Sequence, residues 1–228
     1  MLTLLAAMTI APMNVLVYSK TAGFRHDSIE TGQQMFRELA ADHGFTVTTS
    51  EDPSQFSPYN LRKFNVVVFL NTTGDCLGAG QQKAFEEFIN RGGGFVGIHS
   101  AADTEYDWPF YGSLVSAYFL SHPQIQEADV RNEQPGHPTM KFWPEKFRRK
   151  DEWYDYRANP RPNVTVLASL DTTSYQGSKM AGDHPITWCH DMGEGRAFYT
   201  GFGHTKETYA ELPFRNMVYA ALEWVCKR

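Results

Sequence analysis

One histidine of this chain stands in a setting that is typical of catalytic side chains. His99 follows the apolar run 95–98 and lies among small residues in Gly97–Ala101 (GIHSA). This layout is typical of a nucleophile elbow, a tight strand-to-helix turn that exposes one side chain and requires small neighbours. A histidine at that position can act as a general acid or base, or as a metal ligand. The structural alternative is a histidine that only hydrogen-bonds the backbone at a tight turn.

A second polar group lies in the loop 20–28, after the predicted strand Asn14–Tyr18. Arg25 and His26 stand there, shortly before a predicted helix that Ser28 can cap. Cations beside a helix N-terminus suit an anion or a polarised sugar oxygen. The alternative is a simple capped loop in which Arg25 pairs with Asp27.

Further histidines and one carboxylate fall at the ends of predicted elements: His122, Glu152 and His204. Two or three histidines with a carboxylate suffice for a catalytic zinc site that keeps an open position. No HExxH or HxH spacing connects them, so the sequence does not show whether they converge. If a divalent metal such as zinc is bound, the expected ligands are His99, His122, Glu152 and His204. A metal-free polar pocket is the alternative.

Aromatic residues accompany these polar groups. Trp108 follows the His99 turn, and Tyr154 stands two residues after Glu152. Aromatic faces beside carboxylates suit sugars, whereas ordinary core packing is the alternative for any single ring.

The elements that must position these groups alternate in the first half of the chain. Short apolar runs at 14–18, 45–49, 65–70 and 95–98 predict buried strands, separated by helices up to 43 and at 79–90. This alternation predicts a mostly parallel sheet with right-handed crossovers. Ligands bind such sheets beyond the carboxyl ends of the strands, where His26 and His99 fall.

The second half is predicted to add β structure. A helical stretch is expected at 111–120, strands at 124–130, 165–170, 186–190 and 196–200, and a closing helix at 213–226. The proline-containing segment 131–163 is expected to be irregular. No linker divides the chain, so one domain is expected over 14–228.

Composition excludes several classes of function. The chain has 228 residues and a net charge of −5, with 21 Lys and Arg against 26 Asp and Glu, which argues against nucleic-acid binding. No apolar run approaches the roughly 18 residues of a membrane span. Residues 1–13 are either an N-terminal extension, with Met13 as the natural start, or a weak signal-like segment. The first case predicts a cytoplasmic protein, the second an exported one. The sequence is compatible with either a monomer or a homo-oligomer.

Three widely spaced cysteines, Cys76, Cys189 and Cys226, form no CxxC pair. This argues against a thiolate zinc site, a redox motif or a disulfide framework.

Several stretches together resemble the ThuA-like (trehalose utilisation) family. They are 15–29 (VLVYSKTAGFRHDSI), 92–108 (GGGFVGIHSAADTEYDW), 121–123 (SHP), 151–154 (DEWY) and 195–204 (GRAFYTGFGH). The resemblance implies a class I glutamine amidotransferase-like fold, which is a flavodoxin-like α/β three-layer sandwich. True amidotransferases carry a cysteine at the elbow, where this chain has His99, so glutaminase chemistry is not expected.

The resemblance also implies a small carbohydrate ligand, either a disaccharide such as trehalose or a 3-keto-glycoside. We therefore expect an enzyme, and a non-catalytic sugar-binding or regulatory module is the alternative. The predicted catalytic residues are His99, Glu152 and His204. The predicted substrate-binding residues are Arg25, His26, Asp103, Trp108, His122 and Tyr154.

Overall fold

The structure, a computed structural model, describes residues 12–227. Its main feature is a nine-stranded sheet in the order β2-β1-β3-β4-β11-β10-β9-β6-β7. The predicted N-terminal extension or signal-like segment lies outside the described residues, apart from its last two positions. No helix in the described part of the chain is long and apolar enough to cross a membrane.

Five parallel strands form one half of the sheet. They are β2 (Thr46–Ser50), β1 (Asn14–Tyr18), β3 (Val66–Leu70), β4 (Gly94–Ile98) and β11 (Gly195–Thr200). All residues of β3 and β4 are buried, as parallel strands covered on both faces must be. The predicted mostly parallel sheet in an α/β fold is confirmed.

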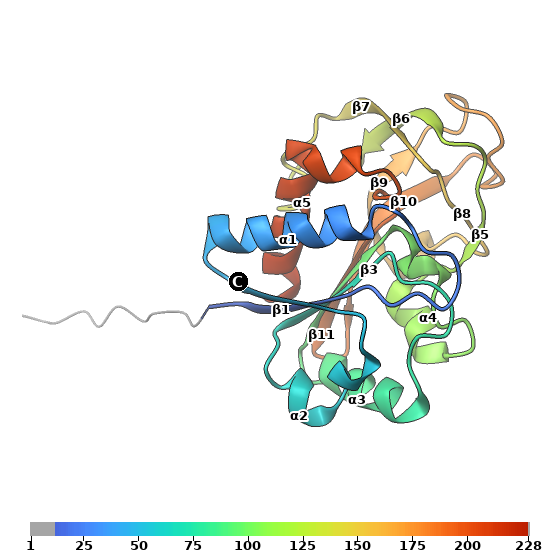
Figure 1. Cartoon of the computed structure of the whole chain (residues 1–228). Helices are drawn as coiled ribbons and strands as arrows, with labels where there is room; N and C mark the ends of the chain where they lie inside the picture. Colours follow the sequence, from blue (N-terminus) through green and yellow to red (C-terminus); the bar gives the residue numbers. More distant parts are fainter. Residues whose placement is uncertain (1–11, 228) are drawn as a thin grey trace, which may run out of the picture.

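Helices cover both faces of this parallel half (Figure 1). One face carries α1 (Ile29–His43) and α5 (Leu212–Val225), which pack against each other. The other carries α2 (Pro58–Leu61), α3 (Ala79–Asn90) and α4 (Pro109–Val115). Short 3₁₀ turns complete the helical elements: η1 (Pro53–Gln55), η2 (His99–Asp103), η3 (Arg161–Asn163) and η4 (Glu207–Ala210).

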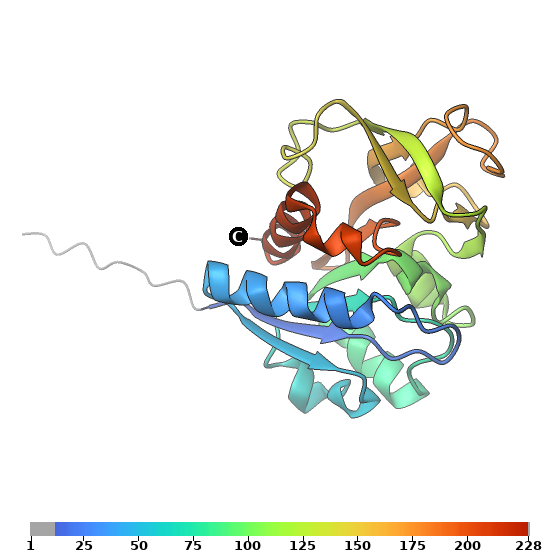
Figure 2. The same cartoon turned by 45° about the horizontal axis from the view of Figure 1, so that its top comes forward.

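The second half of the sheet is antiparallel. It consists of β10 (His184–Met192), β9 (Thr165–Leu170), β6 (Gln126–Asn132) and β7 (Lys146–Asp151). In Figure 2 these strands extend the sheet past α5, away from α1. A separate two-stranded sheet pairs β5 (Phe119–Ser121) with β8 (Asp155–Tyr156). The added β structure predicted for this half is therefore present.

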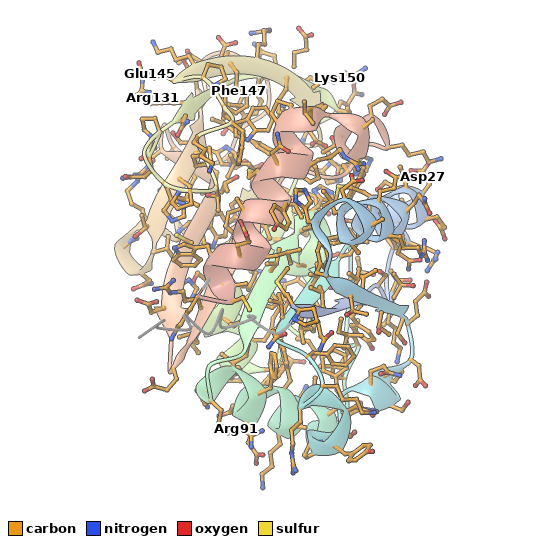
Figure 3. All side chains as sticks on the ribbon, turned by 90° about the vertical axis from the view of Figure 1, so that its left-hand side faces the viewer. Asp27, Arg91, Arg131, Glu145, Phe147 and Lys150 are labelled. Atoms are coloured by element: carbon orange, nitrogen blue, oxygen red, sulfur yellow. The ribbon has the colours of Figure 1, made fainter. Side chains whose placement is uncertain are left out.

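The prediction of an irregular segment at 131–163 was wrong, because β7 and β8 lie within it. The sequence of β7, KFRRKD, is mostly charged and lacks an apolar run. It forms a strand because it pairs with β6 at the edge of the sheet, where alternate side chains reach solvent. Figure 3 shows Phe147 and Lys150 on this edge, at the opposite end of the molecule from Arg91.

Two local predictions also need correction. The helix predicted at 111–120 is the shorter α4, which ends because Ser116 adopts a left-handed conformation with φ 66°. The chain then enters β5. Ser28 occupies the N-cap position of α1, but its side chain donates a hydrogen bond to the carbonyl of Gly203 rather than capping the helix.

Candidate functional site

His99 occupies a strained turn at the carboxyl end of β4. Its φ is 50°, a left-handed conformation that costs a non-glycine residue roughly 1–2 kcal/mol. Tyr199 holds this turn, because its hydroxyl donates a 2.7 Å hydrogen bond to the carbonyl of His99. Strained residues of this kind cluster at functional sites. The elbow geometry expected from the small neighbours of His99 is therefore present.

The loops around this turn are tied together by a second strained residue. Asn71 follows β3, is fully buried and has φ 50°. Its amide donates hydrogen bonds to the hydroxyl of Ser28 at 3.0 Å and to the carbonyl of Gly203 at 3.2 Å. It thus joins the loop after β1 to the loop after β11. The sequence analysis missed Asn71, because a single asparagine after a strand carries no distinctive signal.

Glu152 brings two of the predicted histidines together. Its Oε2 lies 3.3 Å from Nε2 of His99 and 3.0 Å from Nδ1 of His204. The two imidazole nitrogens are 3.3 Å apart. His122 contacts the other carboxylate oxygen, with 3.1 Å between its Nδ1 and Oε1. Three histidines that are distant in the sequence thus surround one carboxylate.

The hydrogen bond on the far side of His99 fixes its tautomer. Nδ1 lies 2.9 Å from the carbonyl oxygen of Gly201, which only accepts hydrogen bonds, so Nδ1 carries the proton. In the neutral ring, Nε2 then presents a lone pair to Oε2 of Glu152. Two lone pairs that face each other at this distance repel, so a positive charge must lie beside them. A second proton on His99 at Nε2, a proton on His204 or a metal cation supplies that charge.

Burial and mutual contact shift the pKa values of these groups. Burial lowers the pKa of His26 to about 2, with a smaller contribution from His99 and His204, so this ring stays neutral. Burial alone would raise the pKa of Glu152, but its close contacts with His204 and His99 outweigh that effect and hold the pKa well below its usual range. Burial likewise opposes the charge on His204, yet the contact with Glu152 raises its pKa.

Four side chains at this point fit a divalent metal ion: His26, His99, Glu152 and His204, whose ligand atoms all lie within 4.8 Å of one another. Adjacent ligands of a tetrahedral zinc ion are about 3.4 Å apart, close to the 3.0–3.3 Å separations among His99, Glu152 and His204. The set differs from the predicted one, because His26 takes the place of His122. His122 instead contacts Glu152, as outer partners of metal ligands do.

His26, His122, Glu152 and His204 line a cavity of about 340 Å³. Aromatic rings contribute much of the remaining wall. The lining residues are Phe24, His26, Asp103, Phe119, His122, Glu152, Tyr154 and His204. Phe24 and Phe119 were missed by the sequence analysis. Phe24 is 67% exposed at this cavity, an unusual position for an apolar ring and one that only the structure reveals.

His99 itself lies behind the cavity. It is fully buried and does not line the cavity. Its ring packs against Tyr154, with 4.2 Å between the ring centroids, and against His26. The elbow layout predicted an exposed side chain at this position, and that prediction was wrong, since the neighbouring rings cover His99. His99 therefore reaches a ligand through Glu152 and His204.

Two predicted substrate-binding residues lie outside the cavity. Arg25 forms ion pairs with Glu30 and Glu51 at 2.7 and 2.9 Å, and not with Asp27. Trp108 is 9% exposed and packs in the core against Phe85 and Tyr111. Neither residue lines the cavity. A sequence position near a motif does not show which way a side chain points.

The cysteines lie apart from this site. Burial raises the pKa of Cys76 and of Cys189 to about 12, which leaves both as unreactive thiols at neutral pH. Cys76 and Cys189 form no disulfide bond.

The fold and the site define an α/β protein with a histidine-rich pocket at the carboxyl edge of its parallel strands. The model of the ThuA family, described as trehalose utilisation, matches residues 14–225. The chain belongs to this family, as the sequence motifs indicated. No protein of curated function matches it in sequence.

Solved structures share the fold. A ThuA-like protein from Bacteroides uniformis is 26% identical, with a TM-score of 0.80 over 96% of this chain and 94% of its own. A ThuA-like protein from Parabacteroides merdae is 20% identical, with a TM-score of 0.76 over 94% and 90%. A β-galactosidase from Bacillus circulans sp. alkalophilus is 13% identical, with a TM-score of 0.62, and this chain covers 31% of its length. The last two likenesses show the fold alone.

Proposed function

We propose that this protein is an enzyme of carbohydrate metabolism that acts on a disaccharide such as trehalose or on its 3-keto derivative. The observation that carries this proposal is the contact of His99 and His204 with Glu152, beside a cavity with aromatic walls. Membership of the trehalose utilisation family supports the substrate class. The cavity volume of about 340 Å³ falls within the range of small-molecule sites.

The side chains of the cavity divide into two roles. Phe24, Phe119 and Tyr154 offer ring faces and edges to the carbon skeleton of a sugar. His204, His122 and Glu152 offer polar atoms to its oxygens. His99 positions Glu152 and His204 from behind, which explains a buried histidine in a strained turn. Arg25 and Trp108 take no part in this assignment.

We further propose that His26, His99, Glu152 and His204 hold a divalent cation such as zinc. Three neutral imidazoles and one carboxylate are a donor set that zinc prefers. Such a cation polarises a carbonyl oxygen or lowers the pKa of a bound water. The protein's own contribution is to keep His26 neutral by burial and to fix the proton of His99 on Nδ1, so that both rings offer a lone pair.

Calorimetry and turnover assays test this proposal together. The purified protein is assayed with trehalose, 3-keto-trehalose and a panel of related disaccharides, with zinc bound and after chelation. We expect binding of at least one sugar and turnover that chelation abolishes and zinc restores. The control is His43→Ala, since His43 is exposed and lies outside the pocket. Binding without any turnover would instead identify a sugar-binding module, and no binding would refute the substrate class.

A further inference from the structure

One carboxylate of the pocket has no part in the histidine cluster. Asp103 ends the turn η2, four residues after His99, and lines the cavity. The hydroxyl of Tyr106 donates a 2.5 Å hydrogen bond to its Oδ1. Among residues 12–227, no cation forms an ion pair with Asp103 and its Oδ2 has no hydrogen-bond partner. One oxygen is thus fixed and the other is free.

Glu152, the second carboxylate of the pocket, has no free oxygen. Both oxygens of Glu152 are engaged, Oε1 by His122 and Oε2 by His99 and His204. These contacts stabilise its ionised form and make it a weak base. Where two carboxylates share a site, their different environments assign their different roles. Glu152 is the fixed anion of the site, and Asp103 is the carboxylate that can take up a proton.

We propose that Asp103 is the general base of this enzyme and removes a proton from the substrate carbon next to a sugar carbonyl. This inference rests on the proposed function, because it requires a keto-sugar in the pocket. The C–H bond breaks and its proton moves to Asp103. Its electron pair forms a carbon–carbon double bond, and the π pair of the carbonyl moves to the oxygen. That oxygen gains negative charge, which the histidine side of the pocket stabilises.

The groups around Asp103 are consistent with this role. Partial burial raises its pKa, whereas the hydrogen bond from Tyr106 and the proximity of His99 and of the Arg157 guanidinium lower it. The guanidinium of Arg157 lies over the Tyr106 ring at 4.0 Å. Glu152, His122, His204 and His26 line the same cavity, and Tyr154 and Tyr199 are electrostatic neighbours of Asp103. Asp103 is therefore a stronger base than an exposed aspartate.

Deuterium exchange tests the step directly. The zinc-loaded protein is incubated with 3-keto-trehalose in D₂O, and proton NMR follows loss of the signal beside the carbonyl. We expect exchange by the wild type and a loss of about 10²–10⁴-fold in Asp103→Asn, with sugar affinity and zinc content retained. Asp103→Glu should recover part of the rate. The matched control is Asp107→Asn, because Asp107 is an exposed carboxylate four residues away.

A positioning variant covers the case in which Asp103→Asn does not fold. Tyr106→Phe removes the hydrogen bond that stabilises the ionised carboxylate of Asp103, so the pKa of Asp103 should rise. The acidic limb of the pH profile of the exchange rate should therefore move to higher pH. A merely structural tyrosine would lower stability without moving that limb.

The outcomes separate the two proposals. A wild type that binds the keto-sugar without exchanging its proton, or an Asp103→Asn variant that exchanges at the wild-type rate, overturns the role of Asp103 and leaves the proposed function standing. A wild type that binds no sugar refutes the proposed function, and the role of Asp103 falls with it.

Discussion

The two halves of the sheet are stabilised in different ways. In the parallel half, β3 reads VVVFL and is buried at every position, with helices on both faces. In the antiparallel half, β7 reads KFRRKD, lies at the edge of the sheet beside β6 and buries alternate side chains. Local apolar runs therefore specify the first half, whereas strand pairing specifies the edge of the second. The site needs both halves, because His26 and His99 follow strands of the first half and Glu152 follows β7 of the second. His122 follows β5 of the separate two-stranded sheet.

The largest expected effect separates an inner ligand from its outer partner. His99→Asn should lower zinc affinity and turnover by more than about 100-fold, because it removes a direct ligand. His122→Asn should cost about 10–100-fold, as outer-partner changes do. Asparagine tolerates the left-handed turn, but the loss of a fully buried ring should lower the free energy of unfolding by about 1–3 kcal/mol. Zinc titration, turnover and thermal unfolding measure these quantities. Equal losses in the two variants would contradict the division into inner and outer residues.

A second pair of variants compares burial in the two halves. Phe69→Ala removes a fully buried ring from β3 and should cost about 3–5 kcal/mol of stability. Phe147→Ala removes a half-buried ring from the edge strand β7 and should cost about 1 kcal/mol. Urea unfolding gives both values. Similar costs would show that the edge contributes as much as the parallel core.

A third variant tests the connection between the halves. Asp151 is fully buried at the end of β7 and accepts hydrogen bonds from the backbone amides of Gly203 and His204. It also pairs with Arg149 at 3.3 Å. Removing one partner of a buried pair costs about 3–5 kcal/mol. Arg149 keeps its ion pair with Glu211, so Asp151→Ala should lower the free energy of unfolding in urea by about 3 kcal/mol, at the lower end of this range. The variant should also weaken zinc binding, because Asp151 holds the backbone of His204. Unchanged zinc affinity would show that this contact does not position His204.

The smallest expected effect concerns pH. His26 has a folded pKa of about 2, below the roughly 6.5 of an unfolded histidine. The unfolded state therefore binds the extra proton first, and the metal-free protein should lose stability as pH falls below about 6.5. The slope from one group is at most about 1.4 kcal/mol per pH unit. His26→Gln should flatten the curve between pH 6 and about 4 in urea unfolding, whereas His43→Gln should not. A curve of unchanged slope would mean that His26 is protonated in the folded state.

Much of the parallel half was predictable because its signals are local. The bounds of β1 and α3 were predicted to the residue, since an apolar run and a periodic helix each carry their own pattern. The edge strand β7 was not predictable, because its residues are mostly charged and it forms only by pairing with the preceding strand β6. Short charged strands form by completing a sheet, which no local window of sequence reveals.

The candidate site shows the same limit. His99, Glu152 and His204 were selected by residue type and by their place at element ends, and the structure brings them into contact. His26 replaces His122 in the candidate ligand cluster. This replacement depends on how the loops after β1 and β11 are held together by Asn71, which bonds Ser28 and Gly203. Arg25 and Trp108 were chosen for their motifs, but neighbouring acids and core rings set their orientation. The residue type indicates a candidate site residue, but only the packing around it shows where its side chain points.

Anomalous diffraction at the zinc absorption edge tests the central claim most directly. Crystals of the wild-type protein grown with zinc should show one strong anomalous peak bonded by His26, His99, Glu152 and His204. The same crystals of His99→Asn should show a weak peak or none. If fully zinc-equilibrated wild-type crystals show no peak there, and the His204 proton alone bridges to Glu152, the pocket is a metal-free polar site and the account is wrong.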